Sequence, residues 1–510
     1  MLQKSKDLFK LWNGHVRYCH WKSNEHLMEG LDGETDLDVL LSNADREEGL
    51  RILSQVGFVK FHSQPGGRYP NVEDWIGFDS ETGRLLHIHL HFALVTGHKG
   101  LKEYELPWAD EALETCMQDL ETGVYIMNPN LELVSLYTRL ILKSTKKQWN
   151  SAKKNSYSID KHFLKEIVYI KERVGWDEVS HIADRYYKEY GSAFTSIVKQ
   201  DTITSQSYLQ LYSMVNKVMK VHSRYHGLSL FVRKYIYQKV IKLRKIMRRR
   251  FDILYITRKV ANPNQGFSVA FIGQDGSGKS TLTGDIQKWL NWKIDAKRFY
   301  LGSGDHYQGY MKAIIYRLKK ERKECGNNNI SSKSNKKGSQ GDNVKNLNTL
   351  RSNVKLLMSA INLKNVANHA NQEVSKSREY IQHGGIALFD RFPQNQFHGI
   401  YDGPKISTEG SSGLLKKIIE YFADREMVYI NKIVKSQPTI VFKLLLPPEE
   451  SIRRKPNEKL EAVTRKAEIT QKLEFPNSII YNIDVTQDYN KELLLIKNII
   501  WNYLAEHHSL

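Results

Sequence analysis

The chain has 510 residues, of which 40% are hydrophobic, and its formal net charge at pH 7 is +20. A chain of this length is longer than one hydrophobic core usually serves, so we expect two or three domains in a soluble globular protein. The positive charge indicates attraction to anions, although charge alone does not choose among phosphates, anionic lipid and nucleic acid.

The cysteines and the N-terminal residues indicate a reducing compartment. Cys19, Cys116 and Cys325 lie far apart, which argues against a disulfide framework or a cysteine zinc site. The first ten residues carry charges where a signal peptide has its apolar run, and no stretch is long and apolar enough to span a bilayer. We therefore expect a cytoplasmic protein.

The first part of the chain, residues 1–115, is predicted to be an α/β unit. Lys22-Ser23-Asn24 precedes a strand in which Asp36 and Asp38 alternate with apolar residues. Two carboxylates on one face of a strand could bind Mg²⁺ and a triphosphate together. The pattern is similar to the Asp-x-Asp strand of nucleotidyltransferases, although the usual Gly-Ser lead is absent. This resemblance implies catalytic and metal-binding roles for Asp36 and Asp38.

A later strand, Arg84 to Phe92, is predicted to place His87, His89 and His91 on one face. These imidazoles could form a metal or phosphate site where nucleotidyltransferases have a third acid. They could equally be structural histidines that only donate hydrogen bonds. The sequence leaves both interpretations open.

The second part, residues 116–262, is expected to be a helical connector. Asn130 to Lys143 has the pattern of an amphipathic helix that packs rather than reacts. The segment from Phe231 to Lys259 contains many basic residues with apolar residues between them, and only one acid, Asp252. This segment could be an interdomain helix with a solvated basic face, or it could contact a membrane or another anionic surface.

The third part, residues 263–510, opens with a strand, a phosphate-binding loop and a helix from Ser280 to Trp292. The loop has the spacing G-x-x-x-x-G-K-[ST]. Backbone N–H groups of such a loop cradle phosphates, its lysine reaches the outer phosphates, and its hydroxyl can ligate Mg²⁺. The sequence therefore predicts ATP and Mg²⁺ as cofactors, bound by Gly273, Gln274, Asp275, Gly276, Ser277, Gly278, Lys279, Ser280 and Thr281.

Apolar runs alternate with helical patterns in this third part, which predicts a doubly wound parallel sheet and an α/β fold class. Residues 325–348 are rich in Asn, Ser, Lys and Gly, so we expect a flexible insertion there. The candidate strands are Phe267 to Gly273, Lys297 to Leu301, Gly385 to Phe389, Thr439 to Leu445 and Ile479 to Asp484.

A second polar constellation follows the third of these strands. Asp390 could hold Mg²⁺ or its water, and the guanidinium of Arg391 could grip a phosphoryl group. Pro447 to Lys455 opens a helix that leads into a basic segment containing Lys459, Arg465 and Lys466. A closing lid in this segment would supply the extra cation that phosphoryl transfer needs.

Residues 265 to 507 resemble thymidylate kinases. The motifs are Asp-Gly-Ser-Gly-Lys-Ser-Thr, Asp-Arg-Phe after a buried strand, Pro-Pro-Glu-Glu before Arg-Arg-Lys, and the late Asn-Ile-Asp-Val strand. The resemblance implies that Asp275 contacts a sugar hydroxyl of the acceptor and that Asp390 serves the Mg²⁺ network. It also implies that Arg391 holds phosphoryl groups and that Arg453 or Arg465 is a lid cation. Arg453 is equally reasonable as part of a solvated helix end.

Two departures concern the acceptor. Thymidylate kinases follow the second strand with Arg-Glu-Pro, whereas this chain has Gly302 to His306 there. The thymine-facing arginine also lacks a clear counterpart. With Asp390-Arg391-Phe392-Pro393-Gln394-Asn395-Gln396 running into Asp402-Gly403-Pro404, the chain looks closer to the thymidylate kinase-like proteins encoded with bacterial surface-polysaccharide enzymes. That likeness implies that the acceptor could be a sugar, a polyol or a glycan end, whereas thymidylate kinases themselves imply a nucleoside monophosphate such as dTMP.

Three functions remain open at this stage. The first is a kinase that moves the γ-phosphoryl group of ATP to a small-molecule acceptor, with Lys279, Asp390, Arg391, Asp275 and a lid arginine as its catalytic residues. The second is a nucleotidyltransferase that acts through Asp36 and Asp38. The third is a nucleotide-gated module that docks on membrane or nucleic acid. We do not expect nucleic acid as a partner, and the sequence leaves the oligomeric state open.

Overall fold

The computed structural model describes residues 1–64, 67–251, 256–302, 340–457 and 459–508. The chain divides into two compact units, one comprising Met1–Asn262 with Leu494–Leu510 and the other comprising Pro263–Leu493. The last helix, α18 (Tyr489–His508), therefore begins in the second unit and ends in the first.

A seven-stranded mixed sheet organises the first unit, in the order β3-β4-β5-β2-β1-β9-β8. Two of these strands, β8 and β9, lie beyond residue 115. The sheet therefore extends past the expected boundary of the α/β part, since β9 pairs in parallel with β1. The strand bounds are β1 Tyr18–His20, β2 Asp36–Leu41, β3 Val59–Phe61, β4 Val72–Asp79, β5 Arg84–His91, β8 Met117–Gln118 and β9 Tyr125–Ile126.

Apolar side chains from β2, β4 and β5 pack with those of three helices in one buried cluster. Trp12 and Tyr18 are buried there, with ring centroids 5.2 Å apart. Two short strands, β6 (Val95–Thr96) and β7 (Tyr104–Glu105), pair as a separate ribbon. The helices of this α/β part are α1 Gln3–His15, α2 Leu27–Leu31, α3 Arg46–Gln55 and α4 Ala109–Glu114.

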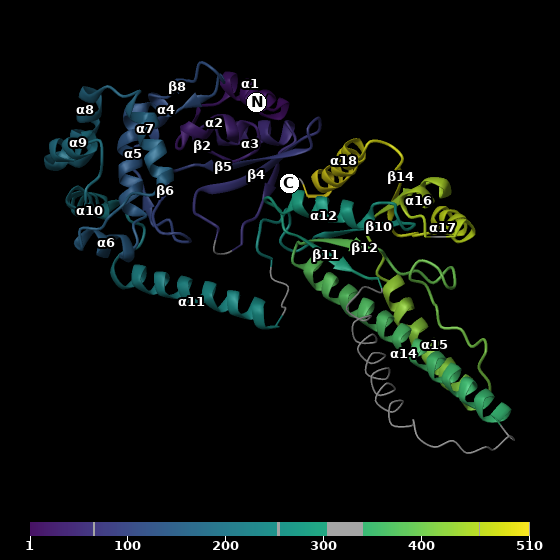
Figure 1. Ribbon diagram of the computed structural model, residues 1–510. Helices are drawn as coiled ribbons and strands as arrows, with labels where there is room; N and C mark the ends of the chain where they lie inside the picture. Colours follow the sequence, from purple (N-terminus) through teal and green to yellow (C-terminus); the bar gives the residue numbers. More distant parts are fainter. Residues whose placement is uncertain (65–66, 252–255, 303–339, 458, 509–510) are drawn as a thin grey trace. The chain divides into compact units, whose positions relative to one another are not determined.

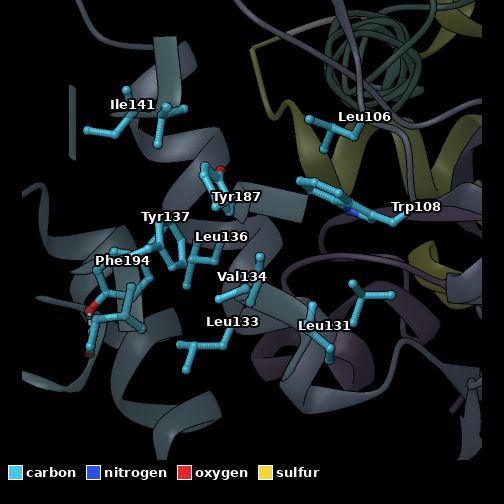
Figure 2. Packing of buried hydrophobic residues seen from close by; sticks show 14 of the residues in the cluster. Leu106, Trp108, Leu131, Leu133, Val134, Leu136, Tyr137, Ile141, Tyr187 and Phe194 are labelled. Carbon is cyan, nitrogen blue, oxygen red and sulfur yellow. Dashed lines mark hydrogen bonds between the residues drawn. The ribbon is translucent and has the colours of Figure 1, made fainter. Parts of the chain in front are cut away.

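The helical part of the first unit is built around α5 (Pro129–Leu142), which is buried on nearly every side. Pro129 occupies its first turn, and the Asn128 side chain accepts a hydrogen bond from the N–H of Asn130, as a helix N-cap does. Figure 2 shows Leu136 and Tyr137 of this helix packed with Tyr187 and Phe194. The surrounding helices are α6 Lys146–Lys153, α7 Lys161–Lys171, α8 Trp176–Tyr187, α9 Gly191–Lys199 and α10 Ser205–Met219.

Residues 231–251 of the basic segment lie in α11 (Gly227–Phe251), which is drawn as one long helix in Figure 1, and residues 252–255 lie outside the described residues. Several of its apolar side chains are exposed, among them Leu228 (81%), Phe231 (70%) and Leu243 (57%). Contact of this helix with an anionic surface stays a prediction. No helix among the described residues is both long enough and apolar enough to cross a bilayer.

The second unit contains a five-stranded parallel sheet in the order β11-β12-β10-β13-β14. This sheet confirms the predicted parallel α/β architecture, and each strand begins and ends within one residue of its expected bounds. The strands are β10 Phe267–Gly273, β11 Ala296–Tyr300, β12 Ile386–Asp390, β13 Ile440–Leu445 and β14 Ile479–Asp484.

Helices connect these strands, as parallel pairing requires. Two of them, α14 (Gln340–Gln382) and α15 (Gly413–Val434), run side by side over much of their length in Figure 1. The expected flexible insertion at 325–348 lies outside the described residues up to 339. Residues 340–348 belong to the start of α14, and the flexibility of the insertion stays a prediction. The other helices that the structure describes in this unit are α12 Lys279–Leu290, α16 Pro448–Arg454 and α17 Leu460–Lys472.

Replacing Leu136 with Ala should lower the free energy of unfolding of the first unit by about 2–5 kcal/mol, because Leu136 is fully buried and its loss leaves a cavity. Urea unfolding followed by circular dichroism measures the change. Leu164→Ala is the matched control, since Leu164 is 42% exposed on α7 and should cost less than about 1 kcal/mol. Equal losses in the two variants would contradict the packing described for α5.

Candidate functional site

The phosphate-binding loop lies between the end of β10 and the start of α12. Gly276 and Gly278 have φ of +83° and +85°, a region that favours glycine, and Gly278 is the N-cap of α12. A Cβ atom on Gly273 would meet the Ser277 Oγ at 2.6 Å and a Leu444 backbone oxygen at 2.9 Å. These glycines let the backbone fold tightly below the positive end of the helix dipole, where phosphates bind.

The ammonium group of Lys279 lies inside this loop. The side chain is 7% exposed, and Nζ donates hydrogen bonds of 2.7 Å to the backbone oxygens of both Gly273 and Gln274. Burial lowers the pKa of Lys279 to about 8, with Arg391 adding to the effect and Asp275 opposing it. A bound anion would restore the charge that burial disfavours, so this cation suits a phosphate ligand.

Ser280 and Asp390 meet where the carboxyl ends of β10 and β12 lie together. The Ser280 hydroxyl donates a hydrogen bond of 2.7 Å to the Asp390 Oδ2, and Arg298 of β11 binds the same oxygen. Asp390 is fully buried, and its Oδ1 has no hydrogen-bond partner among the described residues. A hydroxyl and a carboxylate oxygen are ligands that Mg²⁺ prefers, so these two residues fit that ion.

Asp275 and Arg391 line a cavity of about 190 Å³ beside the loop, together with Lys279, Asp402, Lys405 and Lys466. Arg391 Nη2 lies 3.3 Å from the Asp275 Oδ1, and Lys466 Nζ lies 2.7 Å from Oδ2. Burial by itself would raise the pKa of Asp275, but the hydrogen bond and charge of Lys466, with Lys279 and Arg391, lower it to about 2. The cavity therefore holds ionised groups of both signs.

The cations that contact the loop are not Arg453 and Arg465, the two arginines that the sequence analysis named. Arg453 is exposed and pairs with Glu450 at 2.8 Å, and Arg465 is exposed on α17. The neighbours of these residues make the contacts instead. Arg454 Nη1 donates to the Gly276 backbone oxygen at 3.3 Å, and Lys466 binds Asp275. The sequence placed Lys466 in the basic segment without a role, and it did not single out Arg298.

A second cluster of polar side chains lies on the sheet of the first unit. The parallel register of β2 and β5 pairs Asp36 with His87 and Asp38 with His89, so their side chains share a face. Asp74 on the neighbouring strand β4 joins them and lies 3.1 Å from the His87 Nε2. Asp74 is thus a third carboxylate in this cluster, and the sequence analysis did not single it out. Burial lowers the pKa of His87, with His89 adding to this effect.

Lysines border this cluster. Lys22 Nζ lies 2.8 Å from the Asp38 Oδ1, and Lys259 Nζ lies 3.7 Å from the Asp74 Oδ1. Burial lowers the pKa of Lys102 to about 8, and the charge of Lys22 lowers it further. Burial also lowers the pKa of Lys143 to about 6, and the charge of Arg139 is the next largest cause. Partly buried cations of this kind are suited to an anionic ligand.

The fold and the loop together define a class of protein. A phosphate-binding loop that follows the central strand of a five-stranded parallel sheet is consistent with a P-loop domain. The chain is distantly similar to two proteins of Escherichia coli K12. It is 28% identical over 228 residues to the uncharacterized ATP-binding protein YghR, covering 44% of this chain and 83% of that protein. With the uncharacterized ATP-binding protein YghS, it is 26% identical over 218 residues, covering 42% and 84%. No family model matches the chain.

Replacing Lys279 with Ala should weaken binding of ATP by about 10- to 100-fold, because charge-assisted hydrogen bonds to the phosphates are lost. Titration calorimetry with a non-hydrolysable ATP analogue measures the dissociation constant. Lys288→Ala removes an exposed lysine from the same helix, α12, and should leave the affinity unchanged. Full affinity in the Lys279 variant would argue against phosphate binding at this loop.

Proposed function

We propose that this chain is an ATP-dependent phosphotransferase of the thymidylate kinase-like class. It would move the γ-phosphoryl group of ATP to a small acceptor, either a nucleoside monophosphate such as dTMP or a sugar or polyol of surface-polysaccharide synthesis. The observation that carries the proposal is the contact of Ser280 with the buried carboxylate of Asp390, beside the ammonium of Lys279. The names of the distant relatives, which describe ATP binding, support ATP as the donor.

The donor side of the reaction uses the loop and the end of β12. The ammonium of Lys279 and the backbone N–H groups after Gly273 would hold the outer phosphates. Ser280 and Asp390 would hold Mg²⁺, which when bound neutralises charge on the phosphate oxygens. Arg298 binds the same carboxylate oxygen of Asp390 that accepts from the Ser280 hydroxyl, and so helps to orient it.

Arg391 would act between donor and acceptor. Its guanidinium lies in the cavity wall between two carboxylates, 3.3 Å from Asp275 and 3.7 Å from Asp402. A planar guanidinium in this place can bind a phosphoryl group as charge develops in the transition state. Lys466, which lies on α17 and lines the cavity, would supply the extra cation that we expected from Arg453 or Arg465 of a lid.

The cavity chemistry favours an acceptor that is rich in hydroxyl groups. Carboxylates accept hydrogen bonds from hydroxyls, and Asp275 and Asp402 line the same cavity. Lys405 and Lys466 offer charges to a phosphate or another acid on the acceptor. A phosphorylated sugar and a nucleoside monophosphate each carry hydroxyl groups and a phosphate, so both acceptor classes remain within the proposal.

Replacing Asp390 with Asn should slow phosphoryl transfer by about 100-fold or more, because the transition state loses preorganised charge while the side chain keeps its size. The assay uses γ-labelled ATP, Mg²⁺ and a panel of nucleoside monophosphates, sugars and polyols, and it records which acceptor gains label.

The matched control is Asp424→Asn, which neutralises an exposed aspartate on α15 and should leave the rate unchanged. Label on dTMP would assign a nucleotide kinase, and label on a sugar or polyol would assign a kinase of glycan metabolism. The proposed reaction would be rejected if the Asp390 variant turned over normally. It would also be rejected if no acceptor gained label in a manner that requires Lys279.

A second candidate function belongs to the first unit. Asp36, Asp38 and Asp74 gather on one face of three neighbouring strands, with Lys22 in contact with Asp38. Carboxylates for metal ions next to lysines for phosphates are what nucleotidyl transfer requires. We therefore retain a nucleotidyltransferase, with the P-loop unit supplying substrate or sensing nucleotide, as the alternative.

This alternative predicts pyrophosphate release from a nucleoside triphosphate, and the release should fall at least about 100-fold in the Asp38→Asn variant. A coupled pyrophosphate assay measures it with the wild type, Asp38→Asn and Lys279→Ala side by side. Release that survives the Lys279 change and is lost with Asp38 would favour the alternative. Release that is absent from the wild type, or that persists in Asp38→Asn, would remove it.

A further inference from the structure

Three histidines and three aspartates interleave on one face of the sheet in the first unit. The histidines occupy alternate positions of β5, while the aspartates come from β2 on one side and β4 on the other. His87 Nδ1 lies 2.7 Å from the Asp36 Oδ1. Ligand atoms of Asp36, His87 and His89 all lie within 4.8 Å of one another. A single ion could therefore contact all three residues.

We propose that Asp36, His87 and His89 bind a divalent transition-metal ion, with Zn²⁺ as the representative case. The inference goes beyond the proposed kinase function, because every residue of the site belongs to the first unit and none belongs to the phosphate-binding loop. It also differs from an all-carboxylate magnesium site, since two of its three ligands are imidazoles.

The hydrogen-bond inventory of the imidazoles is the first argument. His87 lies between Asp36 and Asp74, and His89 lies between Asp38 and Asp74, with both contacts of His89 at 3.3 Å. A neutral imidazole has one N–H and one lone pair, whereas a carboxylate only accepts. In its neutral form the His87 ring therefore turns its lone pair toward a carboxylate oxygen, unless the ring takes up a second proton or a metal ion lies between them. A metal ion shared by the two rings and Asp36 would remove that conflict.

The surrounding carboxylates form the second argument. A histidine that binds a metal ion usually donates its other ring N–H to a carboxylate, which fixes the tautomer and the ring orientation. Asp74, at 3.1 Å from the His87 Nε2, is placed to accept from the ring nitrogen that faces away from Asp36. His91 binds Asp38 at 3.2 Å and so positions a further carboxylate beside His89.

Charge and access are consistent with an ion at this place. Lys22 and Lys259 each contact a carboxylate that we assign to the outer set, Asp38 and Asp74 respectively. The side chains of Asp36 and His89 are 28% and 29% exposed, whereas His87 is fully buried. An ion can therefore reach the site from solvent on the side of Asp36 and His89, and the buried ring of His87 would bind it from the interior of the unit.

The ligand set selects the class of metal. Imidazole nitrogen with one carboxylate oxygen suits Zn²⁺ and the other late first-row dications, whereas Mg²⁺ and Ca²⁺ prefer oxygen ligands alone. We therefore expect Zn²⁺ to bind in the presence of excess Mg²⁺, and Co²⁺ to bind with a visible absorption spectrum typical of nitrogen and oxygen ligands.

The test titrates Zn²⁺ into the full chain after treatment with a chelator, in buffer with millimolar Mg²⁺, and follows heat and the unfolding temperature. We expect one equivalent to bind and to raise the unfolding temperature. Asp36→Asn and His89→Gln should each weaken binding by about 100-fold or more, and Asp74→Asn by about 10- to 100-fold. His181→Gln is the matched control, because His181 is exposed on α8.

These variants avoid the fully buried His87, and circular dichroism checks that each one folds. If His89→Gln does not fold, Asp36→Asn alone decides the outcome. The proposal is overturned if Zn²⁺ does not bind the wild type, if the Asp36 variant binds as tightly as the His181 control, or if Mg²⁺ competes on equal terms. Lys279→Ala should leave Zn²⁺ binding unchanged, so failure of the kinase proposal and failure of this one are distinguishable.

Discussion

The parallel pairing of β10 with β12 is the constraint on which the phosphate site depends. Its register sets Phe271 beside Asp390, so Asp390, the last residue of β12, lies next to the start of the loop. Parallel strands end at one edge of a sheet, and α12 begins at the same edge, which brings the hydroxyl of Ser280 within 2.7 Å of the buried carboxylate. Arg298 then compensates the charge of Asp390 from β11, because a buried carboxylate without a cation is costly.

Local sequence was enough to predict the strands of the second unit and the loop, because apolar runs and glycine spacing are properties of short segments. Asp390 was also predictable, since it ends a buried strand. Arg298 and Lys466 were not, because their roles depend on which strand lies beside β12 and on how α17 folds back over the loop. Such contacts join residues far apart in the chain, and no short pattern encodes them.

The first unit shows the same division. Strand alternation correctly placed His87, His89 and His91 on one face, and the parallel register of β2 with β5 brought Asp36 and Asp38 to that face. Asp74 was missed because its strand, β4, reaches the cluster only through antiparallel pairing with β5. Carboxylates on two flanking strands change the interpretation of the histidines, since the rings of His87 and His89 each lie between two carboxylates.

Backbone strain at Arg391 supports the proposed functional interpretation of the Asp390-Arg391 pair. Arg391 has φ of +75°, a conformation that costs a non-glycine residue roughly 1 kcal/mol or more. A turn that only had to end β12 would be more stable with glycine at this position. The arginine is held there by carboxylates on both sides, Asp275 and Asp402, and its guanidinium lines the cavity instead of the core. The strain is thus tied to a charged group that faces an open space beside the loop, which is where a phosphoryl acceptor would have to lie.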